Sequence, residues 1–247
     1  MAADRWAGPD ETLDGALGGA VRLVQPRKGY RFSVDAVLLA RFAAETPADR
    51  ALDLGCGCGV VGLCLLALGG AGELVGVDRN PAMVDRARRS AAASGLADRA
   101  RFEQADLREP GRWRRPRYPL VVSNPPYRPL GRGRVSPDPE VAEACHEVSC
   151  TVDDVVAAAA DALRSRGRFC CVYPAERVVG LLAACRTHGL EPEALWPVHP
   201  RPDAPAHRVL VRAVKGGREG LELRPPLVLH APDRKYSQEA ERLLGPP

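Results

Sequence analysis

The feature that most constrains this chain is a glycine-rich run, Asp53-Leu54-Gly55-Cys56-Gly57-Cys58-Gly59, which follows one apolar stretch and precedes another at 60–68. This pattern predicts a short buried strand, a tight loop and a helix. Closely spaced glycines let a backbone approach a ligand where any Cβ would collide with it. The run therefore predicts a ligand-binding loop at the carboxyl end of a strand in an α/β sheet.

The rest of the chain alternates apolar runs with helical patterns, which favours a parallel sheet with helices on both faces. We expect strands at 51–54, 73–78, 100–105, 118–123, 167–173 and 210–214, and helices at 60–68, 81–94, 153–164, 175–188 and 237–244. Two Pro-rich stretches, 125–139 and 197–205, are expected to be loops, and 221–230 alternates only weakly.

The two ends of the chain are predicted to be additions to one main domain. Residues 1–44 are expected to form an N-terminal edge extension and a helix, with the first thirty residues Gly-rich and irregular and the helix beginning after Ser33. Residues 45–247 are expected to form the main domain with a C-terminal strand and helix appended.

Composition limits the classes of protein that the chain can belong to. Of its 247 residues 45% are hydrophobic and 27% charged, which is ordinary for a packed domain. No apolar run reaches the roughly 18 residues of a membrane span, and the N-terminus lacks a signal-peptide core. We therefore expect a cytoplasmic protein without a membrane segment. The net charge of +4 permits an acidic partner such as RNA without requiring one.

The cysteines and histidines do not form a recognisable metal site. Eight cysteines are present, but none forms a Cys-x-x-Cys pair, which favours reduced thiols over a disulfide framework or a zinc site. His146, His199 and His207 are scattered along the chain. We expect no metal.

The glycine run also matches a dinucleotide fingerprint, since Gly57-Cys58-Gly59-Val60-Val61-Gly62 reads G-x-G-x-x-G. A nicotinamide-dependent oxidoreductase must therefore be considered. Asp53 opposes that interpretation, because a carboxylate just before Gly55 would repel a pyrophosphate. The same carboxylate suits the cationic methionine end of S-adenosylmethionine, a cofactor that carries no phosphate.

Two further acids follow predicted strands. Asp78 ends the strand at 73–78 and can accept hydrogen bonds from both hydroxyls of a ribose. Asp106 follows the strand at 100–105 and can accept from an adenine amino group. Because ligands of α/β sheets bind at the carboxyl edge, the recurrence of Asp53, Asp78 and Asp106 there predicts a nucleoside site.

The catalytic candidates are Asn124-Pro125-Pro126-Tyr127, directly after the strand at 118–123. The exocyclic amine of adenine is a poor nucleophile, because its lone pair is delocalised into the ring. The Asn124 side-chain oxygen and the Pro125 carbonyl can accept from its two N–H bonds and expose that lone pair, while the prolines hold the carbonyl rigidly. Tyr127 can stack on the base. This pattern indicates methyl transfer to a planar nitrogen.

These two motifs, with four other segments, resemble those of class I S-adenosylmethionine-dependent methyltransferases with an Asn-Pro-Pro-Tyr motif, and in particular the bacterial tRNA adenine-N6 methyltransferases that act on valine tRNA. The narrower likeness rests on Gly29 to Leu39, His146-Glu147, Val198 to Pro202, and His207 to Val211. It implies a Rossmann-like, mostly parallel seven-stranded sheet, S-adenosylmethionine as cofactor, and tRNA as substrate, with the anticodon loop as the target region. It also implies that Phe32 and Asp35 lie beside the cofactor.

One departure and several rivals remain. The family usually has an arginine where this chain has Cys145. Release-factor glutamine methyltransferases use the same catalytic motif on a side-chain amide, but they are expected to carry a separate N-terminal helical domain, and only about forty residues precede the predicted fold here. A guanine-N2 or DNA-adenine enzyme also fits the motif.

Two arginine clusters compete as RNA contacts. Arg112, Arg114 and Arg115 are the denser group, but they precede the strand at 118–123. The seven steps from Arg117, at the end of this group, to Asn124 at about 3.3 Å each put the group roughly 20 Å from Asn124, on the opposite edge of the sheet. Arg128, Arg132 and Arg134 directly follow Tyr127. We therefore expect the second group to contact the phosphates nearest the target base.

Overall fold

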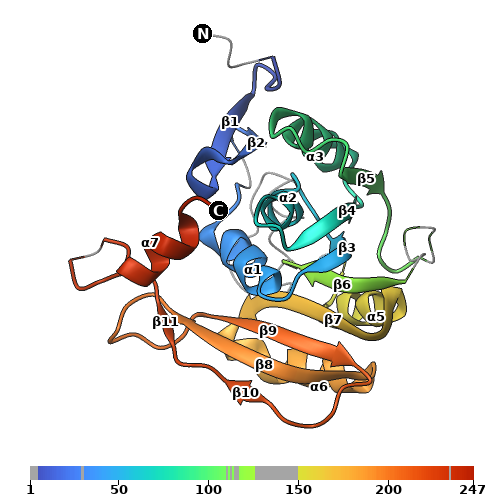
Figure 1. The fold of residues 1–247 in the computed structure, drawn as a ribbon, viewed down its shortest axis with the longest axis vertical. Coiled ribbons are helices and arrows are strands. Elements are labelled where there is room, and N and C mark those ends of the chain that lie inside the picture. Colours follow the sequence, from blue (N-terminus) through green and yellow to red (C-terminus); the bar gives the residue numbers. More distant parts are fainter. Residues whose placement is uncertain are drawn as a thin grey trace.

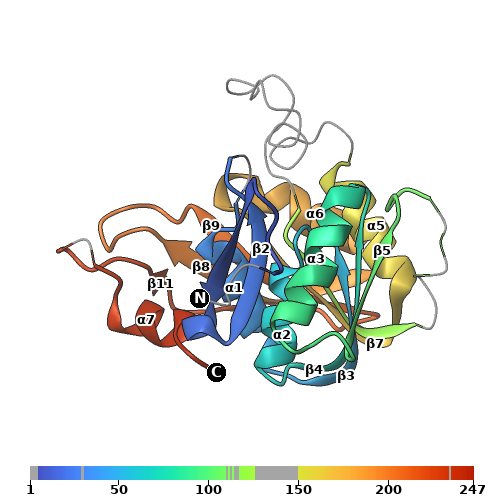
Figure 2. The ribbon, with the colours of Figure 1, turned by 90° about the horizontal axis from the view of Figure 1, so that it is seen from above.

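A twisted, mostly parallel sheet forms the centre of the molecule (Figures 1 and 2). The computed structural model describes residues 5–28, 31–109, 111, 113, 117–125, 150–233 and 235–247. The strand order is β10-β8-β9-β7-β6-β3-β4-β5, with β11 also paired to β8. Within it, β5, β4, β3, β6 and β7 are parallel, and β9 is antiparallel to both β7 and β8. The Rossmann-like fold class expected from the sequence is confirmed.

Seven of the sheet strands are long and two contain only two residues. The long strands are β3 (Ala48–Leu54), β4 (Ala71–Asp78), β5 (Ala100–Gln104), β6 (Tyr118–Ser123), β7 (Leu163–Pro174), β8 (Leu190–His199) and β9 (Arg208–Lys215). The short ones are β10 (Glu222–Leu223) and β11 (Leu227–Val228).

Helices cover both faces of the sheet. On one face lie α1 (Val34–Ala44), α2 (Val60–Ala67) and α3 (Pro81–Ala93), and on the other α5 (Val152–Ala162) and α6 (Val178–Thr187), preceded by the short 3-10 turn Ala175–Arg177 (Figure 1). Two apolar cores result, one on each face, with fully buried residues such as Phe42 in the first and Phe169 in the second. α7 (Gln238–Leu244) packs against α1 near the C-terminus.

Local sequence signals explain where two helices near the site begin. The Asn80 side chain accepts a hydrogen bond from the Ala82 N–H, and Pro81 occupies the first turn, where its missing N–H costs nothing. At α5, Thr151 and Asp154 form a reciprocal capping box. Each cap fixes a helix start next to the carboxyl edge of the sheet.

The N-terminal segment is regular, although the sequence predicts an irregular one. β1 (Glu11–Ala16) and β2 (Val21–Pro26) form an antiparallel hairpin, separate from the main sheet, with the short 3-10 turn Leu17–Gly19 between them. The hairpin packs against α3, where Ser90 Oγ accepts from the Val24 N–H at 2.9 Å. Ser90 of α3 thus accepts a hydrogen bond from a backbone N–H of β2. The residue pattern of β1 and β2 does not predict this contact.

The C-terminal half also differs from expectation. β8 is not expected from the sequence, and its last residues overlap the Pro-rich stretch 197–205, which favours a loop. The register of β8 against β9 shifts between Pro192 and Ala194, and a proline is tolerated at such an irregularity of the strand. α5 ends at Ala162, and β7 already begins at Leu163, four residues earlier than expected.

The topology places several strand ends together. β3 is flanked by β4 on one side and β6 on the other, so the chain order reverses at β3. At such a switch point the loops after neighbouring strands diverge and leave a crevice at the carboxyl edge. The glycine run and Asn124 both lie at this point.

Candidate active site

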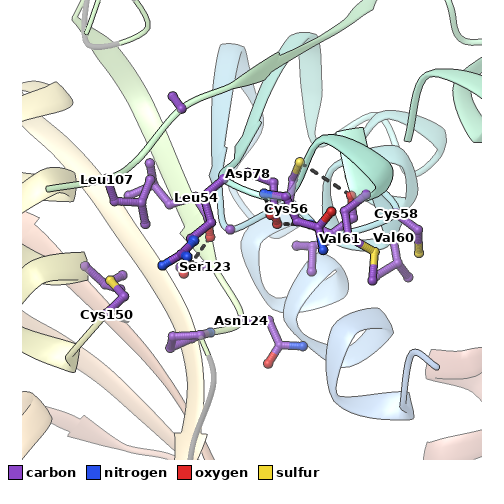
Figure 3. Close-up of a pocket in the computed structure, with 18 of the residues that line it drawn as sticks. Leu54, Cys56, Cys58, Val60, Val61, Asp78, Leu107, Ser123, Asn124 and Cys150 are labelled. Carbon is purple, nitrogen blue, oxygen red and sulfur yellow. Dashed lines mark hydrogen bonds between the residues drawn. The ribbon is translucent and has the colours of Figure 1, made fainter. Parts of the chain in front are cut away.

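A cavity opens at the switch point and brings together residues from distant parts of the sequence. Its wall includes the glycine loop after β3, Asp78 from the end of β4, Asp106 after β5, and Asn124 and Pro125 after β6. Figure 3 shows Asp78, Leu107 and Asn124 meeting around this cavity from three different elements. The cavity therefore lies at the sheet edge where the sequence predicts a site.

The glycines of the loop have two different roles. Gly55 and Gly57 line the cavity with φ of 69° and 54°, and a Cβ added to either would meet no atom within 4 Å. Their missing side chains keep the cavity open. Gly59, with φ of 87°, does not line the cavity, and a Cβ there would meet Phe102 at 3.1 Å. Gly59 therefore serves packing and the start of α2.

Asp53 lies beneath the glycine loop, with only 1% of its surface exposed. Its Oδ2 accepts a hydrogen bond from the Gly62 N–H in the first turn of α2 at 3.0 Å, and its buried Oδ1 has no hydrogen-bond partner among the described residues. Burial raises the pKa of Asp53 to about 7, and the nearby Asp78 carboxylate adds to this effect. A carboxylate thus occupies the helix N-terminus where a dinucleotide pyrophosphate would bind.

Asp78 and Asp106 both line the cavity. Asp78 accepts from the Gly57 N–H through Oδ2 and from the Asn80 N–H through Oδ1, both at 2.9 Å. Asp106 is bound by the Arg108 guanidinium at 2.6 Å, and this hydrogen bond holds the pKa of Asp106 at about 2. These hydrogen bonds orient both side chains, and the one from Arg108 favours the ionised form of Asp106.

Asn124 and Pro125 follow β6 inside the same cavity. The preceding residue, Ser123, is fully buried, and its hydroxyl donates to the Leu54 carbonyl at 2.8 Å. This bond joins the ends of β6 and β3 and so fixes Asn124 relative to the glycine loop. Pro126 and Tyr127 lie outside the described residues, as do Arg128, Arg132, Arg134 and the cluster at Arg112, Arg114 and Arg115.

Phe32 and Asp35, the two residues that the family resemblance places beside the cofactor, differ in their position relative to the cavity. Phe32 lines the cavity. Asp35 is not part of the lining; it is 5% exposed, and its Oδ2 accepts from Arg208 Nε at 3.0 Å. Asp35 thus ties the start of α1 to β9.

The cavity also contains residues that the sequence did not single out. They include Gln25, Pro26, Met83, Leu107, Cys150 and Val155. Leu107 could have been found from its place just after a strand-end acid. Gln25 and Pro26 could not, because they come from the hairpin and reach the cavity only through tertiary packing.

The described cysteines are free thiols, and no group of side chains in the described part of the chain could hold a metal ion. Cys56 and Cys58 lie in the cavity wall, and burial raises the pKa of Cys58 to about 12. These thiols are therefore protonated and act as small apolar groups. Across the residues described, no helix has the length and apolarity needed to cross a membrane.

The sheet has this strand order, with a glycine loop after β3, an acid at the end of β4 and an Asn-Pro pair after β6. Together these features define a class I methyltransferase. The model of the methyltransferase small domain family matches residues 33–179. The chain is 32% identical over 222 residues to the tRNA1(Val) (adenine(37)-N6)-methyltransferase of Dickeya chrysanthemi, covering 88% of this chain and 87% of that protein. A relative of the same name from Porphyromonas gingivalis is 28% identical over 225 residues, covering 87% and 88%.

The chain belongs to this methyltransferase family, and S-adenosylmethionine is its cofactor. Among solved structures, a predicted O-methyltransferase from Agrobacterium tumefaciens, protein Atu636, is similar with a TM-score of 0.68 and 27% identity, over 85% of this chain and 94% of that one. TrmN from Thermus thermophilus, at 22% identity and a TM-score of 0.52 over 73% and 48%, shares the fold.

Proposed function

We propose that this protein transfers a methyl group from S-adenosylmethionine to the N6 atom of an adenine in tRNA, in the anticodon-loop region. The observation that carries the proposal is the placement of Asn124 and Pro125 in one cavity with Asp78 and the glycine loop. The names of the relatives from Dickeya chrysanthemi and Porphyromonas gingivalis support the same base and the same RNA. A tRNA substrate would place the enzyme in the cytoplasm.

The residues of the cavity fit this cofactor. Gly55 and Gly57 leave space where side chains would stand, and Asp78 presents a carboxylate to the ribose hydroxyls. Asp106 and Leu107 line the same cavity and would contact the adenine ring of the cofactor. Asp53, beneath the loop, has a pKa of about 7, and a cationic group bound nearby would favour its ionised form. When bound, S-adenosylmethionine supplies an electrophilic methyl group.

The protein's own contribution to the reaction is alignment and hydrogen bonding. Asn124 Oδ1 and the Pro125 carbonyl would accept from the two N–H bonds of the target amine, so that its lone pair points toward the cofactor side of the cavity. No strong base is needed, because the methylated amine cation is acidic and loses its proton readily. Preorganised acceptors and a reacting distance of about 3 Å would therefore provide most of the rate enhancement.

The name of the Agrobacterium neighbour raises oxygen as a different methyl acceptor. A hydroxyl must be deprotonated as it is methylated, so a base should lie beside it. The residue that follows β6 is Asn124, whose neutral amide cannot take a proton but can accept a hydrogen bond from an amine. This chemistry favours nitrogen.

The decisive experiment is methylation of purified tRNA followed by nucleoside mass spectrometry. We expect N6-methyladenosine in valine tRNA and none in a transcript whose target adenine is replaced. A release-factor protein should be included as a rival acceptor. Methylation of a glutamine side chain in that protein, with no methylated adenine in any tRNA, would replace this proposal with the protein-modifying alternative.

A further inference from the structure

Gln25, near the end of β2, connects the N-terminal hairpin to the cavity. It is 2% exposed and lines the cavity, although it lies far from the glycine loop in sequence. Its Nε2 donates to Asp14 Oδ2 at 2.7 Å, and its Oε1 accepts from the Phe32 N–H at 2.8 Å. Both ends of one buried amide are therefore committed to holding other residues.

Asp14, on β1, is the centre of this network. In addition to Gln25, its Oδ2 accepts from Arg31 Nη2 at 2.7 Å and from Thr12 Oγ1 at 2.8 Å. Arg31 also donates to the Pro26 carbonyl at 3.1 Å. The carboxylate thus holds the end of β2, where Pro26 lies, and the segment before α1, where Phe32 lies; both are cavity residues.

The hairpin that carries the network is itself fixed to α3. Glu11 is bound by Arg86 at 3.0 Å and by Arg89, and these arginines hold the pKa of Glu11 at about 2. Ser94 Oγ accepts from the Arg22 N–H at 2.9 Å, which extends the contact along β2. α3 begins directly after Asp78-Arg79-Asn80. The hairpin is therefore attached to the helix that follows Asp78, the proposed ribose acceptor at the end of β4.

We propose that Gln25 is a positioning residue of the cofactor site, which acts by fixing the Phe32 backbone against the cavity through its link to Asp14. The inference rests on the placement of S-adenosylmethionine in this cavity, which is part of the proposed function. The nitrogen and the oxygen of the Gln25 side chain each make a hydrogen bond within the protein, and the bond to the Phe32 N–H is the link through which Gln25 would act on the cofactor. The hairpin is thus part of the binding site and not only a cover for α3.

Exchanging the polarity of the pair tests this role. Gln25→Glu keeps an acceptor for the Phe32 N–H but places a second carboxylate against Asp14, which repels it. Asp14→Asn alone leaves two amides and removes the charge that holds Arg31. In the double variant the amide introduced on β1 can donate to the carboxylate introduced on β2, which restores this hydrogen bond with its direction reversed. The amide nitrogen cannot accept from Arg31 as Asp14 Oδ2 does, but the carboxylate on β2 keeps one negative charge near Arg31.

Binding of S-adenosylhomocysteine is measured by calorimetry, together with the melting temperature of each protein. We expect Gln25→Glu to weaken binding at least tenfold and the double variant to recover part of this loss, so that it binds more tightly than Gln25→Glu. In turnover assays, the KM for S-adenosylmethionine should rise for Gln25→Glu while kcat changes less than threefold. Gln238→Glu, the same chemical change on the exposed face of α7, is the control and should bind normally.

Unchanged binding by Gln25→Glu, or a double variant no better than the worse single one, would overturn the proposal. So would a loss of binding that only follows the fraction unfolded in both single variants, because the network would then be structural alone. Asp78→Ala separates this outcome from an error in the site itself: if it binds S-adenosylhomocysteine normally, the cofactor lies elsewhere, whatever the Gln25 variants do. The binding and melting measurements do not require RNA, so they can be made whatever the methyl acceptor is.

Discussion

The Asp78 carboxylate accepts a hydrogen bond from the Gly57 N–H at 2.9 Å, so the end of β4 holds the glycine loop that follows β3. The other carboxylate oxygen accepts from the Asn80 N–H, also at 2.9 Å. A carboxylate oxygen can accept more than one hydrogen bond, so these bonds leave Asp78 able to receive a ribose hydroxyl as well. One side chain therefore holds the glycine loop, and in the proposed site it would also accept from the ribose, which would couple loop geometry to cofactor binding.

The first prediction concerns this side chain. Asp78→Ala should weaken S-adenosylhomocysteine binding by a few kcal/mol, because hydrogen bonds to a charged acceptor contribute about 1.5–3 kcal/mol each. Asp78→Asn keeps one acceptor oxygen and should lose less. Calorimetry is the measurement, with Asp98→Ala, a change at an exposed residue, as control.

NAD and NADP should not bind, because the Asp53 side chain already occupies the N-terminus of α2. Tight NAD binding would contradict the cofactor site described here.

The second prediction separates chemistry from binding. Asn124→Ala should lower the rate of methyl transfer by about a hundredfold or more, as the loss of one preorganised polar group does in other enzymes. Asn124→Asp keeps an acceptor oxygen and should be less impaired. Both variants should bind S-adenosylhomocysteine within a few-fold of the unmodified protein. Single-turnover kinetics with saturating cofactor would measure the rate, and near-normal turnover by Asn124→Ala would refute the proposed mechanism.

The third prediction concerns stability and pH. The pKa of Asp53 is about 7 in the folded protein against an ordinary value of 3.8, so between these values the folded state binds the extra proton. Its contribution to the free energy of unfolding must therefore fall as pH rises from about 4, and the decline must be complete above about 7. Asp53→Asn should remove this dependence. Urea unfolding without cofactor gives the free energy of unfolding of each protein at pH 5 and at pH 8. The decrease from pH 5 to pH 8 should be larger for the unmodified protein than for Asp53→Asn, by on the order of 1–4 kcal/mol. Identical changes would show that Asp53 does not titrate in this range.

The fourth prediction tests the two arginine clusters. Replacing Arg128, Arg132 and Arg134 together should flatten the salt dependence of RNA binding by roughly 0.7–0.9 in log–log slope for each phosphate that is no longer neutralised. Cofactor affinity should not change. Replacing Arg112, Arg114 and Arg115 should impair full-length tRNA but not a short anticodon stem-loop. The reverse pattern, with stem-loop methylation abolished only by the second triple variant, would invert the proposed placement of the RNA.

The sequence by itself determined the order of the central elements and most of the residues at the sheet edge. Strand, glycine loop and helix around Gly55 follow from local pattern, because a buried parallel strand is apolar on both faces and its loop must contain residues of special conformation. Asp78, Asp106 and Asn124 could be assigned to one site because the carboxyl ends of parallel strands lie on one edge. The cofactor also followed from these residues and is confirmed by the family.

Tertiary structure decided what long-range contacts control. The hairpin at β1 and β2 carries no strong local signal, and it depends on Ser90 and Ser94 at α3 for part of its hydrogen bonding. β8 forms in spite of two prolines, because its pairing with β9 outweighs a poor local propensity. Gln25 enters the cavity only because the hairpin is packed there, and Asp35 faces Arg208 of β9 instead of the cavity. Local sequence encodes the period and the turns of a chain, but a contact between residues far apart depends on the packing of whole elements, which no local pattern contains.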